Sequence, residues 1–266
     1  MLRPYITFMQ LEHFYFFSHI PGLRHAISTR HGGVSKSTFT ALNLGFHVND
    51  DAAAVQKNRR LLAKAVEFEI ENLVAAQQTH NDQIYIVQKE DAGRGALDWE
   101  SAIPDTDALI TAEENIPLLI QVADCAPVLL ADAEARVLGT AHAGWRGAAS
   151  GIAGKTMQKM MELDADPKST FAGIGPCLCT KCLEIGEEVA DLITPHYPGA
   201  IQISTKKPHL NLREMIRQDL IEAGLKPDHI EAMDECPRCD TRKYFSHRGE
   251  NGTTGRFGLV AWWEEI

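Results

Sequence analysis

The sequence lacks the segments that mark an exported or membrane-spanning protein. Its longest apolar run, residues 116–131, is interrupted by Gln121 and Asp124 and is shorter than the roughly 20 residues that span a bilayer. Residues 1–20 are aromatic, but they include Glu12 and lack the uninterrupted apolar core of a signal peptide. We therefore expect a cytoplasmic protein with no membrane partner.

Positive charge is also scarce. The chain has 26 Lys and Arg against 36 Asp and Glu, a formal net charge of −10, which repels the phosphate backbone of a nucleic acid. We expect no nucleic-acid partner, although a few local arginines can still hold a small anion. Repeats, low-complexity tracts and Ser/Gly linkers are absent too, so we expect a single domain over residues 1–266.

What the sequence does contain is a mixture of helical and strand patterns. Apolar spacing behind an Asn49-Asp50 cap signal predicts an amphipathic helix over 50–66, and a glycine-rich turn leads into a predicted helix over 148–161. Short β-type runs do not alternate strictly with helices, which favours an α+β sandwich over a wound parallel sheet. The remaining predicted helices cover 184–193 and 212–223, with Gly224 as the C-cap, and the predicted strands cover 84–87, 108–111, 128–130, 137–141, 171–174 and 259–263.

Metal-competent side chains occur in three strand-like segments: QQTH with His80, VADC with Cys125 and TAHAGWRG with His142. Two imidazoles and a thiolate suit Zn²⁺, and three protein ligands leave a fourth position open for chemistry; copper accepts the same set. Asp124 is placed to orient one imidazole. The alternative is that these residues are ordinary core side chains, because buried cysteines usually behave as small hydrophobes.

Several arginines are candidates for binding an anion. Arg146 lies between two glycines at the predicted start of a helix, where backbone N–H groups can also hold an anion. Arg30 lies in the Gly-rich segment STRHGGVS, and Arg59 lies on the first predicted helix. Arg248 and Arg256 follow an aromatic pair in KYFSHRGENGTTGRFG, a combination that suits a stacked base and an anion. The alternatives are solvated arginines, a tight turn and a plain hairpin.

The other cysteines form two clusters, CLCTKC and CPRC. Four thiolates from two such clusters can build a structural zinc site, although the clusters are far apart in the sequence and one cysteine is left over. Exposed, redox-sensitive thiols are the alternative. The candidate ligands are Cys177, Cys179, Cys182, Cys236 and Cys239.

Taken together, these motifs resemble the laccase-domain family, also called the polyphenol oxidase-type or YfiH-like purine nucleoside phosphorylases. RHAISTRHGGVS, LNLGFHVNDD and NRRLL are similar to its amino-terminal pattern, and QTH, DALIT, VADCAPVLLAD and TAHAGWRG to its central motifs. GPCLCTKCLEIG, NLREMIRQDL and YFSHRGENGTTGR resemble the remainder, so the similarity covers nearly the whole chain.

This resemblance implies a four-layer α/β/β/α sandwich with a mixed sheet. It also implies one zinc ion held by His80, Cys125 and His142, which then form the catalytic centre. The implied activities are phosphorolysis of adenosine, inosine and 5′-methylthioadenosine to base and ribose 1-phosphate, adenosine deamination, and a copper-dependent phenol oxidation. The residues expected to bind the nucleoside and inorganic phosphate are Arg30, Asn43, Arg59, Arg146 and Arg248.

Three other hypotheses remain open at this point. A copper-dependent polyphenol oxidase is one, but a single copper cannot store the four electrons that reduce O₂ to water. A hydrolase with Cys125 as nucleophile and His80 or His142 as base is the second. The third is a non-catalytic module that binds purines or metals.

Two details of the expected site are less defined. An acid must protonate the departing purine, and His31 and Asp124 are the candidates. The sequence departs from the usual family pattern at Asn81, Ala123 and His247, where Gly, Thr and Tyr are common. These departures bear on which nucleoside is preferred.

Overall fold

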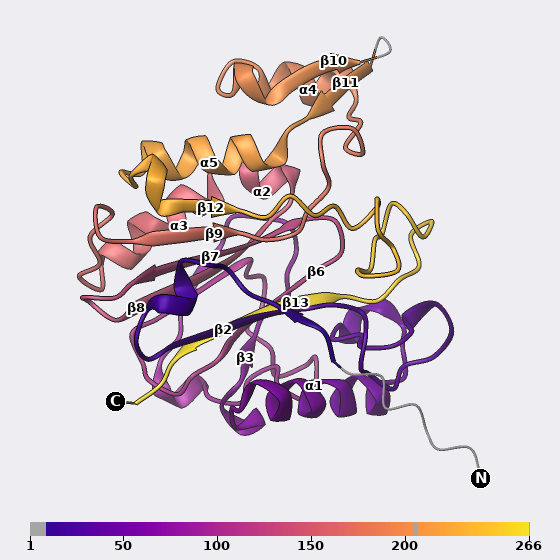
Figure 1. Ribbon diagram of the computed structural model, residues 1–266, viewed down its shortest axis with the longest axis vertical. Helices are drawn as coiled ribbons and strands as arrows, with labels where there is room; N and C mark the ends of the chain where they lie inside the picture. Colours follow the sequence, from indigo (N-terminus) through magenta and orange to yellow (C-terminus); the bar gives the residue numbers. More distant parts are fainter. Residues whose placement is uncertain (1–8, 205–206, 266) are drawn as a thin grey trace.

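The computed structural model describes residues 9–204 and 207–265, which form two packed β-sheets with helices on the outer faces (Figure 1). The helices are α1 Ala52–Val66, α2 Trp145–Ala149, α3 Ile152–Met161, α4 Glu187–Ile193 and α5 Leu212–Glu222. The strands are β1 Leu11–Glu12, β2 Leu23–Ser28, β3 Val74–Ala75, β4 Ile84–Ile86, β5 Ala108–Thr111, β6 Leu118–Val122, β7 Ala126–Asp132, β8 Val137–Ala143, β9 Phe171–Ile174, β10 Ile201–Ser204, β11 Lys207–Leu210, β12 Ile230–Ala232 and β13 Phe257–Trp263.

Both sheets are mixed. The larger has the order β12-β9-β7-β8-β5-β4, and its pairs are antiparallel except β12 with β9 and β4 with β5. The smaller has the order β1-β2-β13-β6-β3, with only β3 and β6 parallel. Strands β10 and β11 form a separate antiparallel hairpin. The expected α+β class is therefore confirmed.

Alternation of side chains along the central strands produces three apolar layers. In β7, Val128 faces the helices α2, α3 and α5, whereas Leu129 faces the other sheet. In β13, Leu259 packs between the sheets and Val260 packs toward α1 with Leu62. Successive side chains of a strand point to opposite faces, so strands covered on both sides are apolar throughout. The order helix, sheet, sheet, helix confirms the expected four-layer sandwich (Figure 1).

The predicted elements are mostly correct, with three local corrections. The helix expected over 184–193 begins only at Glu187, because Glu184 forms an isolated β-bridge with His209. The helix expected over 148–161 is two helices, α2 and α3, separated at Gly151, whose φ of 74° interrupts the helical path. The cap of α1 is Asp51, which accepts a hydrogen bond from the backbone N–H of Ala53, and not the Asn49-Asp50 pair. Gly224, just beyond α5, has the positive φ of 104° typical of a residue that ends a helix.

Among the described residues, no helix combines the length and the apolar character that crossing a membrane requires.

Candidate metal centre and its pocket

The register of the larger sheet brings the three expected metal ligands together. Cys125 immediately precedes β7, and His142 lies near the end of the antiparallel neighbour β8, opposite Pro127. His80 lies in the turn before β4, and β4 runs parallel to β5, which pairs with β8. Residues distant in sequence therefore meet at one edge, because the start of one antiparallel strand lies beside the end of its neighbour.

The donor atoms of His80, Cys125 and His142 all lie within 4.8 Å of one another. The two imidazole rings are 4.6 Å apart at an angle of 75°. Gly144 makes room for this cluster: a Cβ there would lie 2.9 Å from the Cys125 Sγ and 3.3 Å from the His80 ring. Two nitrogens and a sulfur at this spacing form a donor set that fits a divalent zinc or copper ion.

Asp107 holds two of these ligands in place, although the sequence did not single it out. It is fully buried, and its carboxylate pairs with His142 Nδ1 at 2.7 Å. It also accepts hydrogen bonds from the backbone N–H groups of Thr79, His80 and Asn81 at 2.9–3.1 Å. A carboxylate on one ring nitrogen leaves the other nitrogen directed toward a metal. The only sequence signal for this role was the position of Asp107 within the DALIT motif.

The cluster favours an ionised sulfur. Burial opposes ionisation of the Cys125 thiol, but His142 and His80 outweigh it and lower its pKa to about 6. Burial likewise opposes charging of His142, but Cys125 and Asp107 raise its pKa to about 9. The protein therefore stabilises a thiolate at neutral pH, which is the form of cysteine that binds metals.

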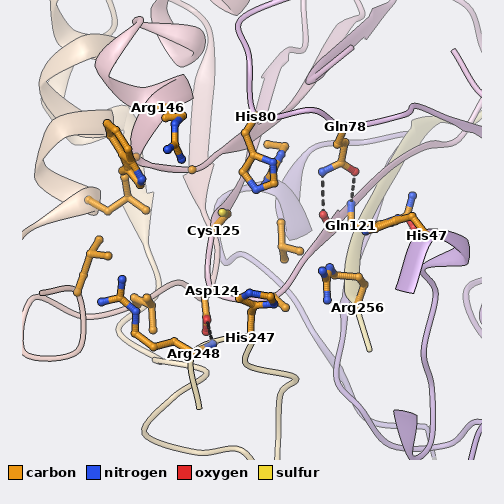
Figure 2. A pocket seen from close by; sticks show the side chains of 18 residues that line it. His47, Gln78, His80, Gln121, Asp124, Cys125, Arg146, His247, Arg248 and Arg256 are labelled. Atoms are coloured by element: carbon orange, nitrogen blue, oxygen red, sulfur yellow. Dashed lines mark hydrogen bonds between the residues drawn. The ribbon is translucent and has the colours of Figure 1, made fainter. Parts of the chain in front are cut away.

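Asp124 has a different role from the one expected. It accepts a hydrogen bond from the Ser246 hydroxyl at 2.6 Å and one from the backbone N–H of Arg248 at 2.6 Å, the latter drawn in Figure 2. It orients no imidazole, because Asp107 occupies that position. Its φ of 89° is unusual for a residue with a side chain, and burial raises its pKa. Asp124 thus fastens the carboxyl-terminal loop beside Cys125.

A cavity of about 320 Å³ opens on the metal-ligand set, and Figure 2 shows the residues around it. Three of its lining residues carry guanidinium groups: Arg146, Arg248 and Arg256. The volume falls within the range of small-molecule sites, and the cationic side chains suit an anionic ligand. Other lining residues include His47, Gln78, Gln121, Ala123, Trp145, Leu178, Leu183 and His247.

The three guanidinium groups of the pocket differ in their hydrogen-bond partners. Arg146 is exposed at the rim, with its guanidinium 4.3 Å from the Trp145 ring centre. Arg248 donates to the carbonyls of Cys182 and Glu184 at 3.0 and 2.9 Å. Arg256 donates to two neighbouring carbonyls, and burial lowers its pKa. Arg248 and Arg256 are therefore anchored by backbone, which preorganises their charge.

The other expected substrate residues, Arg30, Asn43 and Arg59, lie outside the pocket lining. Arg59 is buried, donates to the carbonyls of Leu44, Gly95 and Ala96, and donates to the Gln121 side chain at 3.0 Å. Gln121 lines the pocket and exchanges two hydrogen bonds of 2.8 Å with Gln78 (Figure 2).

Asn43 and Arg30 also contact residues of the loop that carries Arg248 and Arg256. Asn43 accepts a hydrogen bond from the backbone N–H of Arg256 at 2.8 Å. Arg30 pairs with Glu250 at 3.0 Å, and Glu250 accepts from the backbone N–H of Ser246 in the loop that carries Arg248. These residues support the pocket wall and do not touch its interior. His31 is not among the lining residues either.

The two cysteine clusters also meet. Cys179, Cys182, Cys236 and Cys239 have their sulfur atoms within 4.8 Å of one another. Cys177 is fully buried in the core beside them and is not part of this group. The second metal-competent cluster therefore has four members, and Cys177 is the one left over.

The family model described as multi-copper polyphenol oxidoreductase laccase matches residues 24–264. The chain belongs to this family.

Relatives of this chain include proteins named for two different activities. A purine nucleoside phosphorylase, YlmD of Geobacillus stearothermophilus, is 37% identical over 236 residues, 86% of each chain. An adenosine deaminase, RL5 from an unknown prokaryotic organism, is 30% identical over 254 residues, 93% of this chain and 97% of its own.

Solved structures match as well. The crystal structure of YlmD from Geobacillus stearothermophilus superposes with a TM-score of 0.89 at 35% identity, covering 92% of this chain and 93% of that one. YfiH of Bacillus licheniformis, described as a hypothetical protein, has a TM-score of 0.91 at 31% identity and covers 98% of both chains.

Proposed function

We propose that this chain is a cytoplasmic, zinc-dependent purine nucleoside phosphorylase with adenosine deaminase activity, built as one domain. Its substrates are adenosine, inosine and 5′-methylthioadenosine, which are cleaved with phosphate to base and ribose 1-phosphate. The observation that carries the proposal is one pocket whose lining combines His80, Cys125 and His142 with the guanidinium groups of three arginines. The names of the YlmD and RL5 relatives support both activities.

His80, Cys125 and His142 would hold the metal, with Asp107 fixing the orientation of His142. When bound, zinc supplies a Lewis acid that polarises an oxygen of phosphate or water. The lowered pKa of Cys125 favours its thiolate at neutral pH, which is the form that binds the ion. The structure thus provides ionised sulfur and oriented nitrogens without having to rearrange.

The arginines provide the phosphate site. Arg146 has a planar, two-pronged donor set at the pocket rim, and Arg248 and Arg256 lie on the opposite loop. Breaking an N-glycosidic bond develops positive charge on the ribose, so a phosphate held beside it stabilises that charge and is placed to attack it. The imidazole of His47 also lines the pocket and adds a hydrogen-bonding group.

The test compares two variants in two assays. Cys125→Ala removes the thiolate from the metal set, and we expect both phosphorolysis and deamination to fall at least about 100-fold. Arg146→Ala leaves the metal set intact, so we expect a roughly tenfold higher KM for phosphate with deamination nearly unchanged. Full activity of Cys125→Ala in either reaction would disprove the shared metal centre.

Two alternative functions are each supported by one observation. The family model is named for phenol oxidation, and the same ligand set accepts copper; oxidase activity that tracks one tightly bound copper per chain would favour that reading. The low pKa of Cys125 beside His142 also suits a nucleophilic thiolate. A chain that is active with no metal bound would favour the thiolate.

A further inference from the structure

We infer that Cys179, Cys182, Cys236 and Cys239 form a second metal site, a structural zinc site separate from the pocket. All four sulfurs lie within 4.8 Å of one another, and they come from two loops far apart in the sequence. Four thiolates with no additional ligand position form a closed tetrahedral set, the arrangement that holds structural zinc.

The two loops present their cysteines in the same local conformation. In Cys179–Cys182 the backbone N–H groups of Cys182 and the next residue both donate to the Cys179 carbonyl, at 2.9 and 3.0 Å. In Cys236–Cys239 the backbone N–H groups of Cys239 and the next residue donate to the Cys236 carbonyl, at 3.0 and 3.1 Å. Each Cys-x-x-Cys segment is thus the same tight turn, which directs both of its sulfurs to one point.

The sulfur spacing matches a shared ion. Sulfur atoms arranged tetrahedrally at the Zn–S distance of 2.3 Å are about 3.8 Å apart. The Cys239 Sγ lies 3.5 Å from Cys182 Sγ and 3.9 Å from Cys179 Sγ. All four cysteines are free, so no disulfide accounts for their convergence.

This site lies behind one wall of the pocket. Leu178 and Leu183, on either side of the first turn, line the cavity, and the Cys182 carbonyl accepts the hydrogen bond from Arg248. Arg238, inside the second turn, donates to the same carbonyl at 3.2 Å. Zinc would join these two loops and so keep Arg248 in position. This consequence for Arg248 rests on the proposed function, whereas the metal site itself does not.

The first experiment counts zinc in the full chain, purified without added metal, and in three variants. We expect about two zinc ions per chain in the parent. Cys239→Ser and Cys125→Ala should each lose one, from different sites. The matched control, Cys177→Ala, removes a neighbouring cysteine outside the cluster and should keep both. A count that is unchanged in Cys239→Ser would overturn the proposal.

Cobalt gives a readout that does not depend on enzyme activity. Metal-free Cys125→Ala reconstituted with Co²⁺ should give the sulfur-to-metal charge-transfer absorption of a four-thiolate tetrahedral site. The double variant with Cys239→Ser in the same Cys125→Ala background should lose it. In the parent, a Cys179 or Cys239 disulfide detected by mass spectrometry would overturn the site, as would iron in place of zinc.

The link to the pocket has its own measurement. Cys239→Ser should raise the KM for phosphate about three- to tenfold while its remaining zinc is retained, because only the anchor of Arg248 is loosened. An unchanged KM would refute the link to Arg248. If the parent shows no phosphorolysis, the proposed function fails, while the zinc and cobalt results still decide whether the second site exists.

Discussion

Replacing Asp107 by asparagine tests whether one buried carboxylate organises the metal centre. Its Oδ1 accepts from the backbone of His80 and pairs with His142 Nδ1, and its Oδ2 accepts from the backbone of Thr79 and Asn81. An asparagine has one oxygen, so its amide N–H₂ must face one of these pairs of donors. Whichever way it is turned, two hydrogen bonds to a charged acceptor are lost.

The size of the effect follows from these contacts. Hydrogen bonds to a charged group contribute about 1.5–3 kcal/mol each, so the free energy of unfolding should fall by about 3–6 kcal/mol. Loss of a carboxylate behind a metal-binding histidine lowers metal affinity about 10- to 100-fold. We expect zinc affinity of Asp107→Asn to fall within that range, measured by competition with a chelator on folded protein.

Asp105→Asn is the matched control. This neighbouring carboxylate accepts from the Thr79 hydroxyl and the Asn81 side chain, both at 2.7 Å, but contacts no imidazole. We expect its zinc affinity to stay within about twofold of the parent. If Asp107→Asn folds and binds zinc as tightly as Asp105→Asn, the role assigned to Asp107 is wrong.

Two further predictions concern stability and packing. His25 is 7% exposed, its Nε2 accepts the backbone N–H of Phe14, and burial lowers its pKa from 6.5 to about 4. Because the folded protein favours the neutral imidazole, His25 contributes about 3 kcal/mol to the free energy of unfolding above pH 6.5, and this contribution is lost as the pH falls through 4. Denaturant titrations of His25→Gln over the same pH range should lack that loss. Gly144→Ala places a Cβ 2.9 Å from Cys125 Sγ and should lower zinc affinity about tenfold, whereas Gly199→Ala, where a Cβ meets nothing within 4 Å, should leave it unchanged.

The fold class was predictable because the apolar pattern of the strands is strong. The runs over 108–111 and 171–174 are the strands β5 and β9, and the helix over 212–223 differs from α5 by one residue. The break between α2 and α3 was not predictable, since a single glycine inside a helical pattern is usually tolerated. The structure shows that Gly151 adopts a left-handed conformation, which the pattern alone does not reveal.

The proposed metal ligands were easier to select from the sequence than the residue that orients them. His80, Cys125 and His142 carry recognisable chemistry, and residue type together with the family motifs selected three side chains that the structure brings together. Asp107 was missed because an aspartate before a strand has many common roles, and only the register of β5 against β8 places it beside His142. Residue type reveals what a side chain can do, whereas its neighbours depend on strand pairing.

For the arginines, too, residue type did not reveal which neighbours each side chain has. Charge alone did not distinguish Arg59, which is buried among backbone carbonyls, from Arg146, which is exposed at the rim. Arg256 was noticed in its loop, but its position in the pocket depends on Asn43, a residue more than two hundred positions earlier. Such pairings are set by the completed sheet, and sequence spacing carries no information about them.

The position of β13 has a consequence for how the protein is made. This strand lies in the middle of the smaller sheet, between β2 and β6, and its Gly258 donates to Ser28, 230 residues earlier. During synthesis, β2 and β6 leave the ribosome long before β13. The smaller sheet therefore stays incomplete, with apolar side chains exposed, until β13 has been made. Such late, long-range pairing is slow, and it leaves apolar surfaces prone to aggregation exposed until the last strand pairs.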